Sequence, residues 1–272
     1  MKSQSTNTGP RFEPFGRRGV LRVAMWCLLA PCAAFGQAVQ AMPDKVADAI
    51  ARVKSGNSYG VAIEQIAEAH AVQAIPALKE QFLLSQDADS KAQIASALVR
   101  LGDADDSYWN YLIGQATDAV KSDAPFPAMF DANGKVVRGQ LSPEFAVWAK
   151  AHNVSPELAA EDVVYRLPGK VLFLAETGDP RGIPLLRQAL QSPNFLIAAA
   201  AGEGLAVIQD KGSIQLIISV CKRSPAEAAA EIAKSLVYFD DPQAQIAVDS
   251  YVPKNVANAL REARAAGRTP FR

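Results

Sequence analysis

The sequence predicts an all-α protein, an α-α superhelix in which helix pairs stack into a solenoid, with a small central insertion that holds a β-hairpin. The first observation is a fixed interval, because Asp179, Asp210 and Asp241 follow one another at steps of 31 positions. The second is that apolar residues keep this interval, so that Leu236 follows Leu205. Apolar residues within each interval recur every three or four positions, as in an amphipathic helix. A period of this length indicates units that bury their apolar faces only against neighbouring units.

The unit that opens at Asp179-Pro180 is predicted to contain two helices. The first carries Ile183, Leu186 and Leu190 on one face. Ser192-Pro193 is predicted to start the second helix, because serine caps free amides and proline fits the first helical position. The second helix continues through apolar positions at Ile197, Ala201, Leu205 and Ile208.

The following unit repeats this plan through Ile214 and Ile217, and Ser224-Pro225 with Glu227 has the spacing of a capping box. Cys221 takes the place that Leu190 holds one unit earlier, which favours a buried apolar role over a reactive thiol. A matching unit occurs upstream, a helix pair is expected before it over residues 44–70, and a polar terminal helix is expected over residues 255–267. The earlier inward positions are Ile50, Val53, Ile63, Ile66, Ile75, Leu78, Phe82, Ile94, Leu98 and Leu101.

The repeat register fails between Asp103 and Asp179, because their separation of 76 positions is not a multiple of the repeat. After a helix predicted from about Ser107 to Ala119, we expect an insertion at about residues 121–168. Asn133-Gly134 between apolar runs predicts a hairpin turn. Two Ser-Pro-Glu segments then predict helix starts, and a Pro-Gly pair is expected to interrupt the chain before the repeat resumes; these lie at Ser142, Ser155 and Pro168-Gly169.

The repeats resemble bacterial HEAT repeats of the short, phycobilisome-lyase-like type. The resemblance depends on the Asp-Pro opening, on Ile75-Pro76-Ala77-Leu78 and Ile183-Pro184-Leu185-Leu186, and on the Ala-rich segment 198–206. It extends from Gly178 to Asp241, is weaker from Val72 to Asp103 and is absent from the insertion. It implies a solenoid of about five helix pairs in residues 42–272 that binds other proteins. In one branch, similar repeats belong to enzymes that attach or isomerise bilin chromophores, but the motif assigns no catalytic residue here.

The N-terminus has the pattern of an export signal over residues 1–41. A basic stretch ends at Arg22, an apolar run follows to Phe35, and small residues surround Ala38 and Ala41. Arg17-Arg18 leaves ordinary and twin-arginine export open, and Cys32 lies in the outline of a lipoprotein box with an ill-fitting proline before it. We expect a periplasmic or extracellular protein with no membrane span after signal removal. Removing the signal leaves 28 − 5 = 23 basic and 28 − 1 = 27 acidic residues, a balance that argues against nucleic-acid binding.

Candidate chemistry in the mature sequence is sparse. His70 and His152 lack neighbours at metal-ligand spacing, so we interpret them as helix-end residues. Asp131-Ala132-Asn133-Gly134 begins like a calcium loop, but a hairpin turn is the simpler interpretation. Helix capping similarly accounts for the acidic cluster around Asp105. Glu203 is expected on a solvated face, with its flanking glycines permitting close helix packing; we predict no cofactor, no metal site and no catalytic residue.

Aromatic residues are concentrated before and within the insertion. Aromatic side chains are enriched where proteins bind one another, and they also serve as the core of small folded segments. Both interpretations remain open at this point, with Trp109 and Trp148 the best candidates for contact with a partner. The candidate partner-binding residues are Tyr108, Trp109, Tyr111, Phe130, Phe145 and Trp148.

These patterns favour an exported, non-catalytic scaffold that binds another protein. A lyase-like or chromophore-handling enzyme is the first alternative, and it would need a pocket with convergent titratable groups. A binder of cell-wall material or carbohydrate through the aromatic insertion is the second alternative. Insertions in repeat arrays project from one face, often the binding face, so we expect function to depend on the insertion.

The first testable prediction concerns processing. The small residues at the end of the apolar run predict that the mature protein begins just after Ala38 or just after Ala41. Intact-mass analysis of the exported protein should give one of these two masses. A mature protein that retains residues before Gly36 would contradict the assignment.

Overall fold

The computed structural model describes residues 38–56 and 59–271 of the chain. The predicted export signal therefore lies outside the described residues up to position 37. The described chain is mainly helical, with one small antiparallel sheet. Of the described helices, none combines the length and the hydropathy that a membrane crossing requires.

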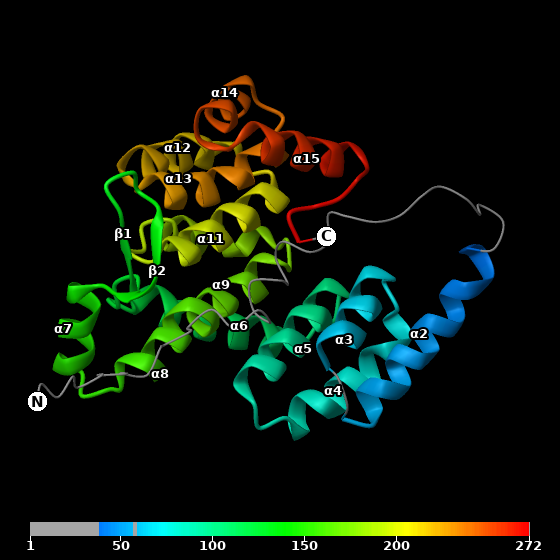
Figure 1. Ribbon diagram of the computed structural model, residues 1–272. Helices are drawn as coiled ribbons and strands as arrows, with labels where there is room; N and C mark the ends of the chain where they lie inside the picture. The colour runs from blue at the N-terminus through cyan, green and yellow to red at the C-terminus, as the bar shows by residue number, and fades with distance from the viewer. Residues whose placement is uncertain (1–37, 57–58, 272) are drawn as a thin grey trace, which may run out of the picture.

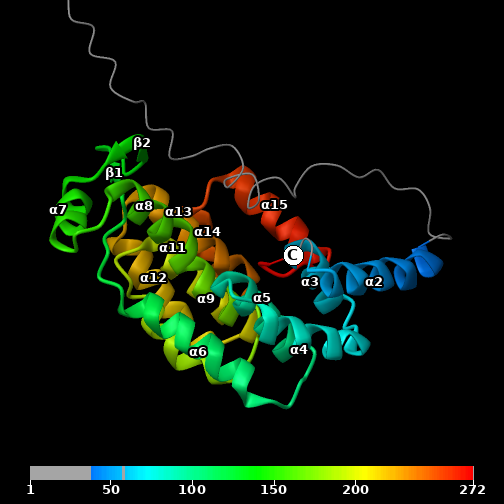
Figure 2. The ribbon, with the colours of Figure 1, turned by 90° about the horizontal axis from the view of Figure 1, so that it is seen from below.

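Consecutive helices pair along the chain, and each pair packs against the next (Figure 1). The described residues form six pairs, one more than the sequence indicated. They are α2 (Ala38–Lys54) with α3 (Tyr59–Glu68), α4 (Ile75–Leu84) with α5 (Ala88–Arg100), α6 (Asp106–Lys121) with α9 (Leu167–Ala175), α10 (Ile183–Ala189) with α11 (Phe195–Ile208), α12 (Ile214–Arg223) with α13 (Ala226–Ala233), and α14 (Pro242–Tyr251) with α15 (Lys254–Ala265). Figure 2 shows α2 at one end of the molecule and the insertion at the other.

Short 3₁₀ turns connect the pairs. They are η1 (Val72–Ala74), η3 (Pro180–Gly182), η4 (Lys211–Ser213) and η5 (Lys234–Tyr238). The periodic aspartates lie at these junctions, where Asp179 accepts a hydrogen bond from the Arg181 amide and Asp241 accepts from the Gln243 amide. Asp210 instead pairs with Arg187 at 2.8 Å. The periodic aspartates thus mark the start of each first helix.

One continuous apolar core extends from α2 to α15. The second helices contact one another in order, α3 with α5, α5 with α9, α9 with α11 and α11 with α13. Cys221 is buried in this core as predicted, and burial raises the pKa of its thiol to about 12. Most predicted inward positions are confirmed, since fully buried side chains include Val53, Ile63, Ile66, Leu78, Ile94, Leu98, Leu186, Leu205 and Leu236. The others pack against the core while partly exposed, and they are Ile50, Ile75, Phe82, Ile183 and Ile208.

The register gap has a simple origin. Helices α6 and α9 form one ordinary pair, and residues 122–166 are inserted between them. The stretch from Asp103 to Asp179 is therefore one repeat unit of the usual length plus this inserted segment. The sequence estimate of 121–168 overlapped the two helices slightly, because helix boundaries are the least certain part of a sequence prediction.

The insertion contains the predicted hairpin and both predicted helix starts. Strand β1 (Ala128–Phe130) pairs antiparallel with β2 (Val136–Leu141), and α7 (Pro143–Ala151), α8 (Pro156–Glu161) and the π-helical turn η2 (Asp162–Arg166) follow. A separate small core forms around Phe145 and Val163. No residue of the insertion belongs to the buried main core of the described chain. The insertion is thus a small folded unit attached to the side of the repeats.

Three local predictions were wrong. Helix α11 begins at Phe195 and is capped by Asn194, because the Ser192 hydroxyl accepts from the Asn194 amide instead of capping the helix. The Ser224 hydroxyl donates to the Val220 carbonyl, and α13 begins without a side-chain cap. Pro168 does not interrupt the chain, because α8, η2 and α9 follow one another without a break and Pro168 comes just after the π-helical turn η2.

Helix α11 passes between α9 and α13 at short range, and glycine permits this. A Cβ atom on Gly204 would lie 2.5 Å from the Ala175 Cβ, and one on Gly202 would lie 2.8 Å from the Ser235 hydroxyl oxygen. The prediction that these glycines allow close packing is confirmed.

We predict that Gly204→Ala destabilises the protein. The new methyl group would collide with the Ala175 backbone, and such overpacking costs about 1 to 3 kcal/mol, more than the roughly 0.5 to 1 kcal/mol that alanine gains in helix propensity. Gly114→Ala in α6 is the matched control, because its Cβ would meet nothing within 4 Å. Denaturant melts should show Gly204→Ala less stable and Gly114→Ala at least as stable as wild type. Equal stability of the two variants would contradict this packing.

Candidate binding pocket beneath the hairpin

The β-hairpin of the insertion extends along the repeats and docks on the first turn of α13 (Figure 1). The Glu227 amide donates to the Gly134 carbonyl at 2.9 Å. The Val136 amide donates to the Glu227 carboxylate at 2.8 Å. Glu227, predicted to serve a capping box, thus joins the hairpin to a helix pair two units away from α6.

The tip of the hairpin requires glycine at its contact with α13. Gly134 has φ +71, and a Cβ there would lie 2.4 Å from the Ala226 backbone nitrogen. Asp131 organises the turn, because its carboxylate accepts from the amides of Asn133 and Lys135 at 2.8 and 2.9 Å. The hydrogen bond from the Lys135 amide is the main reason that the pKa of Asp131 is lowered. The interpretation of this segment as a hairpin turn is confirmed.

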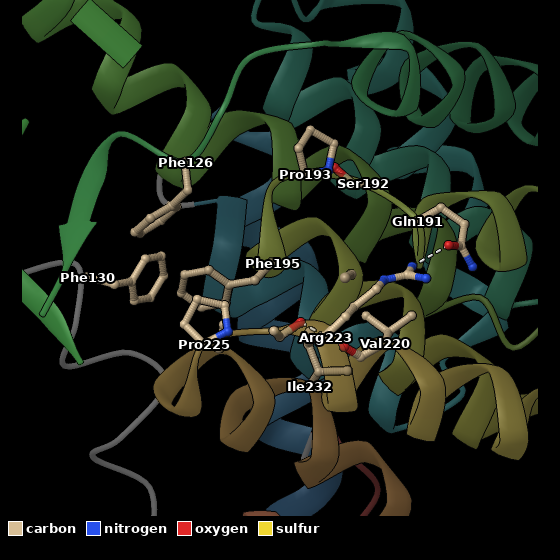
Figure 3. A pocket seen from close by; sticks show the side chains of 13 residues that line it. Phe126, Phe130, Gln191, Ser192, Pro193, Phe195, Val220, Arg223, Pro225 and Ile232 are labelled. Carbon is tan, nitrogen blue, oxygen red and sulfur yellow. Dashed lines mark hydrogen bonds between the residues drawn. The ribbon is translucent and has the colours of Figure 1, made fainter. Parts of the chain in front are cut away.

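The docked hairpin closes one side of a pocket of about 280 Å³ (Figure 3). The other walls come from the start of α11, the end of α12 and the start of α13. The lining residues are Phe126, Phe130, Gln191, Ser192, Pro193, Phe195, Ala198, Val220, Arg223, Ser224, Pro225, Ala228 and Ile232.

One end of the pocket is aromatic. The rings of Phe126 and Phe195 lie 4.6 Å apart between centroids, and Phe130 lies 5.9 Å from Phe126 and 6.1 Å from Phe195. Two of these rings come from the insertion and one from α11, so neither part of the protein has this surface alone. Figure 3 shows the three rings together on one side of the pocket.

The other end is polar and positively charged. The exposed Arg223 guanidinium donates to the Gln191 side-chain carbonyl, a neutral partner. Within residues 38–56 and 59–271, Arg223 makes no ion pair, whereas Arg187 pairs with Asp210 and Arg181 with Asp179. The pocket also lies at the N-terminal ends of α11 and α13, where the helix dipoles add positive potential.

Three of the aromatic residues predicted to contact a partner lie on α6, where Tyr108 and Tyr111 pack towards α4 and Trp109 packs towards η3. Tyr108 and Tyr111 each contact the edge of Phe82, with centroids 4.9 and 5.5 Å apart. Trp109 is only 7% exposed and lies beneath the Arg181 guanidinium at 4.5 Å. Trp109 was a leading contact candidate, but it fills the space between helices instead.

The other three predicted residues belong to the insertion. Phe145 is fully buried, and Trp148 stacks on it at 5.5 Å while donating its indole N–H to Asp123 at 2.8 Å. Phe130 alone of the six lines the pocket. Sequence reasoning missed Phe195 and Arg223, although both break the repeat, since the residues at the equivalent places one unit away are Ala226 and Ser192.

A second group of charged residues lies along the row formed by the second helix of each pair. Arg100 forms a bidentate pair with Glu64 at 2.8 and 2.9 Å. Burial raises the pKa of Glu176 to about 7, with the charge of Glu64 as the next cause. Burial also raises the pKa of Glu203 to about 8, helped by the charge of Glu231. Glu203 was expected on a solvated face, but it is only partly exposed and its carboxyl group is largely desolvated.

The remaining candidate residues have structural roles. Asp105 caps α6 by accepting from the Ser107 amide at 2.9 Å. His70 and His152 are exposed at the C-terminal ends of helices, as predicted. The described residues contain no group of three or more His, Cys, Asp or Glu side chains placed to hold a metal ion. Comparisons of the chain with protein-family models, curated proteins and solved structures find no match.

The raised pKa of Glu203 predicts a pH dependence of stability. The folded protein holds this proton more tightly than the unfolded chain, whose pKa is near 4.5. This contribution to stability is fully present below about pH 4.5 and is lost as the pH rises towards 8. Glu203→Gln has no charge to bury, so it should lose less unfolding free energy than wild type between about pH 5 and pH 9.

Denaturant melts at several pH values test this prediction. The exposed Glu262 of α15 provides the matched control Glu262→Gln. The control should follow the wild-type pH profile. If both variants follow it, the Glu203 carboxyl is solvated and the assigned pKa is wrong.

Proposed function

We propose that this protein is an exported, non-catalytic scaffold of HEAT-like repeats that binds another protein through the pocket beneath the hairpin. The observation that carries this proposal is the docking of the insertion. Its hairpin extends past α11 to α13 and creates a pocket with an aromatic end and an arginine without an ion-pair partner in the described chain. Export remains part of the proposal because of the N-terminal pattern.

The stacking of the helix pairs supports the superhelix. Second helices contact one another from α3 to α13, and the apolar core is continuous across the pairs. Such arrays offer extended surfaces for protein partners. We propose that the repeats act as the rigid support and the insertion as the binding element.

The separation of the two cores supports a binding role for the insertion. Residues 122–166 add no buried residue to the main core and have a small core of their own. Segments of this length in compact arrays are usually functional. Because the hairpin is clamped by Glu227, the aromatic rings are held in position before a partner arrives, and this lowers the entropy cost of binding.

The chemistry of the pocket favours binding over catalysis. Arg223 carries the one charge among the lining residues, and no His, Cys, Asp or Glu lines the pocket. A lyase-like activity is favoured only by Glu176 and Glu203, which can exchange protons near neutral pH. Glu203 has no hydrogen bond or ion pair to another side chain within the described residues. The half-buried Trp148 and the exposed Tyr165 are what a carbohydrate binder would offer.

The insertion variant tests the proposal. Replacing residues 122–166 by a short Gly-Ser linker should leave a helical protein that no longer captures its partner from the periplasm or medium of its host. Circular dichroism checks the fold and affinity capture checks the binding. Full capture by the shortened protein would mean that the repeat surface binds the partner and that the proposal is wrong.

A point variant tests the docked hairpin without removing the insertion. Gly134→Val should displace the hairpin, because a Cβ cannot fit beside Ala226, and capture should fall. Gly267→Val is the matched control, since it places the same residue at a similar positive φ of +78 with nothing within 4 Å of its Cβ. Equal capture by the two variants would show that hairpin docking is irrelevant to binding.

A further inference from the structure

We infer that the pocket beneath the hairpin binds the C-terminal residue of a partner protein, with the apolar side chain against the phenylalanine rings and the terminal carboxylate on Arg223. This inference rests on the proposed function and names the part of the partner that is recognised. It is carried by three features of the pocket: its two-ended lining, its guanidinium with only a neutral partner, and its size.

The aromatic end selects an apolar side chain. Phe126, Phe130 and Phe195 line it together with aliphatic side chains from α12 and α13. Their ring centroids lie 4.6 to 6.1 Å apart in tilted arrangements, so ring surface faces the pocket. An aromatic or large aliphatic side chain gains most from such a surface, because it removes the largest apolar area from water.

The polar end selects a carboxylate. The guanidinium of Arg223 has five N–H donors, of which Gln191 accepts one contact, and the fork of the remaining donors matches the two oxygens of a carboxylate. No carboxylate of the protein lines the pocket, so the positive charge is uncompensated there. The Gln191 amide group accepts from Arg223 through its oxygen, and its NH₂ group remains able to donate to the same ligand.

The volume of the pocket suits one large residue of a ligand. At about 280 Å³, the pocket lies just below the range of roughly 300 to 1,000 Å³ that holds drug-sized ligands. A single residue that carries both an apolar side chain and a carboxylate fits this volume. In a polypeptide, an apolar side chain and a free carboxylate share one residue only at the C-terminus.

Fluorescence anisotropy with peptides dye-labelled at the N-terminus tests the inference on the full-length chain. The probes are a Gly-Ser peptide that ends in phenylalanine with a free carboxylate, the same peptide as its C-terminal amide, and the same peptide ending in alanine. The first should bind, and the other two should bind at least about tenfold more weakly, as expected for loss of a charge-assisted bidentate pair or of a buried aromatic ring.

Variants assign the binding to the pocket. Arg223→Gln and Phe130→Ala should each lower the affinity for the peptide with a free carboxylate by at least about tenfold. Arg138→Gln, at an exposed position of β2 outside the lining, is the matched control and should change the affinity by no more than about twofold, the range of ordinary surface substitutions. Thermal melts of all variants confirm that weaker binding does not reflect unfolding.

Several results would overturn the inference. Equal binding of the carboxylate and amide peptides would show that the pocket does not recognise a terminal carboxylate. Equal affinities of Arg223→Gln and Arg138→Gln would place the peptide elsewhere. Binding of free phenylalanine but of none of the peptides would make the pocket a small-molecule site. Absence of peptide binding, alongside capture of a partner that depends on residues 122–166, would refute the C-terminal specificity and leave the proposed function standing.

Discussion

The close approach of α9, α11 and α13 is the constraint on which the rest of the structure depends. No helix pair here can bury its apolar face alone, so each must contact the next. Helix α11 is the most enclosed of the second helices, with small residues over much of its length. Gly204 meets Ala175, and Gly202 meets Ser235, at distances that a Cβ atom would not allow. This packing continues the core from the N-terminal pairs to the C-terminal pairs.

The same packing has an electrostatic consequence. Glu203 lies between the two glycines, so the helices that they admit also remove water from its carboxyl group. Its raised pKa is a direct result of that desolvation. Glu176, at the end of α9, lies in the same row and is affected by the Arg100 and Glu64 pair. Burial is the main cause of both raised pKa values, and no catalytic role is required to explain them.

The insertion uses the regularity of the stack as a support. Because α6 and α9 pair normally, the chain can leave the repeat after Lys121 and return at Leu167 without disturbing the core. Its own small core holds α7 and α8, and its hairpin spans the distance to α13. The pocket forms where the insertion meets the repeats. Such junctions are common locations of binding sites, since each part supplies a wall that the other lacks.

Several arginines of the described chain pair with carboxylates, whereas Arg223, which lines the pocket, does not. Arg181 and Arg187 pair with aspartates at the starts of first helices, and Arg100 pairs with Glu64. These pairs recur at structural junctions and fasten one pair of helices to another. Arg223 has only a neutral amide partner among the described residues, and it faces a pocket without acids. Arg138 and Arg268 also lack an ion pair within the described residues, so what supports the proposed anionic ligand is the place of Arg223 in a pocket that no acid lines.

Most of the helical plan was determined by the sequence itself. Periodic apolar residues and the recurring aspartates are local signals, so helix pairs, inward leucines, the buried Cys221 and the Asn133-Gly134 turn could all be predicted from spacing. Local signals failed where two groups compete for one partner. Asn194 replaced Ser192 as a helix cap, and Glu227 was drawn from its own helix to the hairpin.

Only the tertiary structure determines which residues come together in the pocket. Phe126 and Phe195 are far apart in the sequence, and Arg223 belongs to yet another helix pair. No spacing rule brings them together, because their proximity depends on where a hairpin from one repeat docks on another. Burial also separates the aromatic residues by role. Trp109 and Phe145 are buried between packed elements, whereas Phe130 lines the pocket. The sequence determined which residues form helices and which faces are apolar, since these depend on neighbours in the chain. The tertiary structure decided which side chains remain free to bind, since that depends on what packs against them.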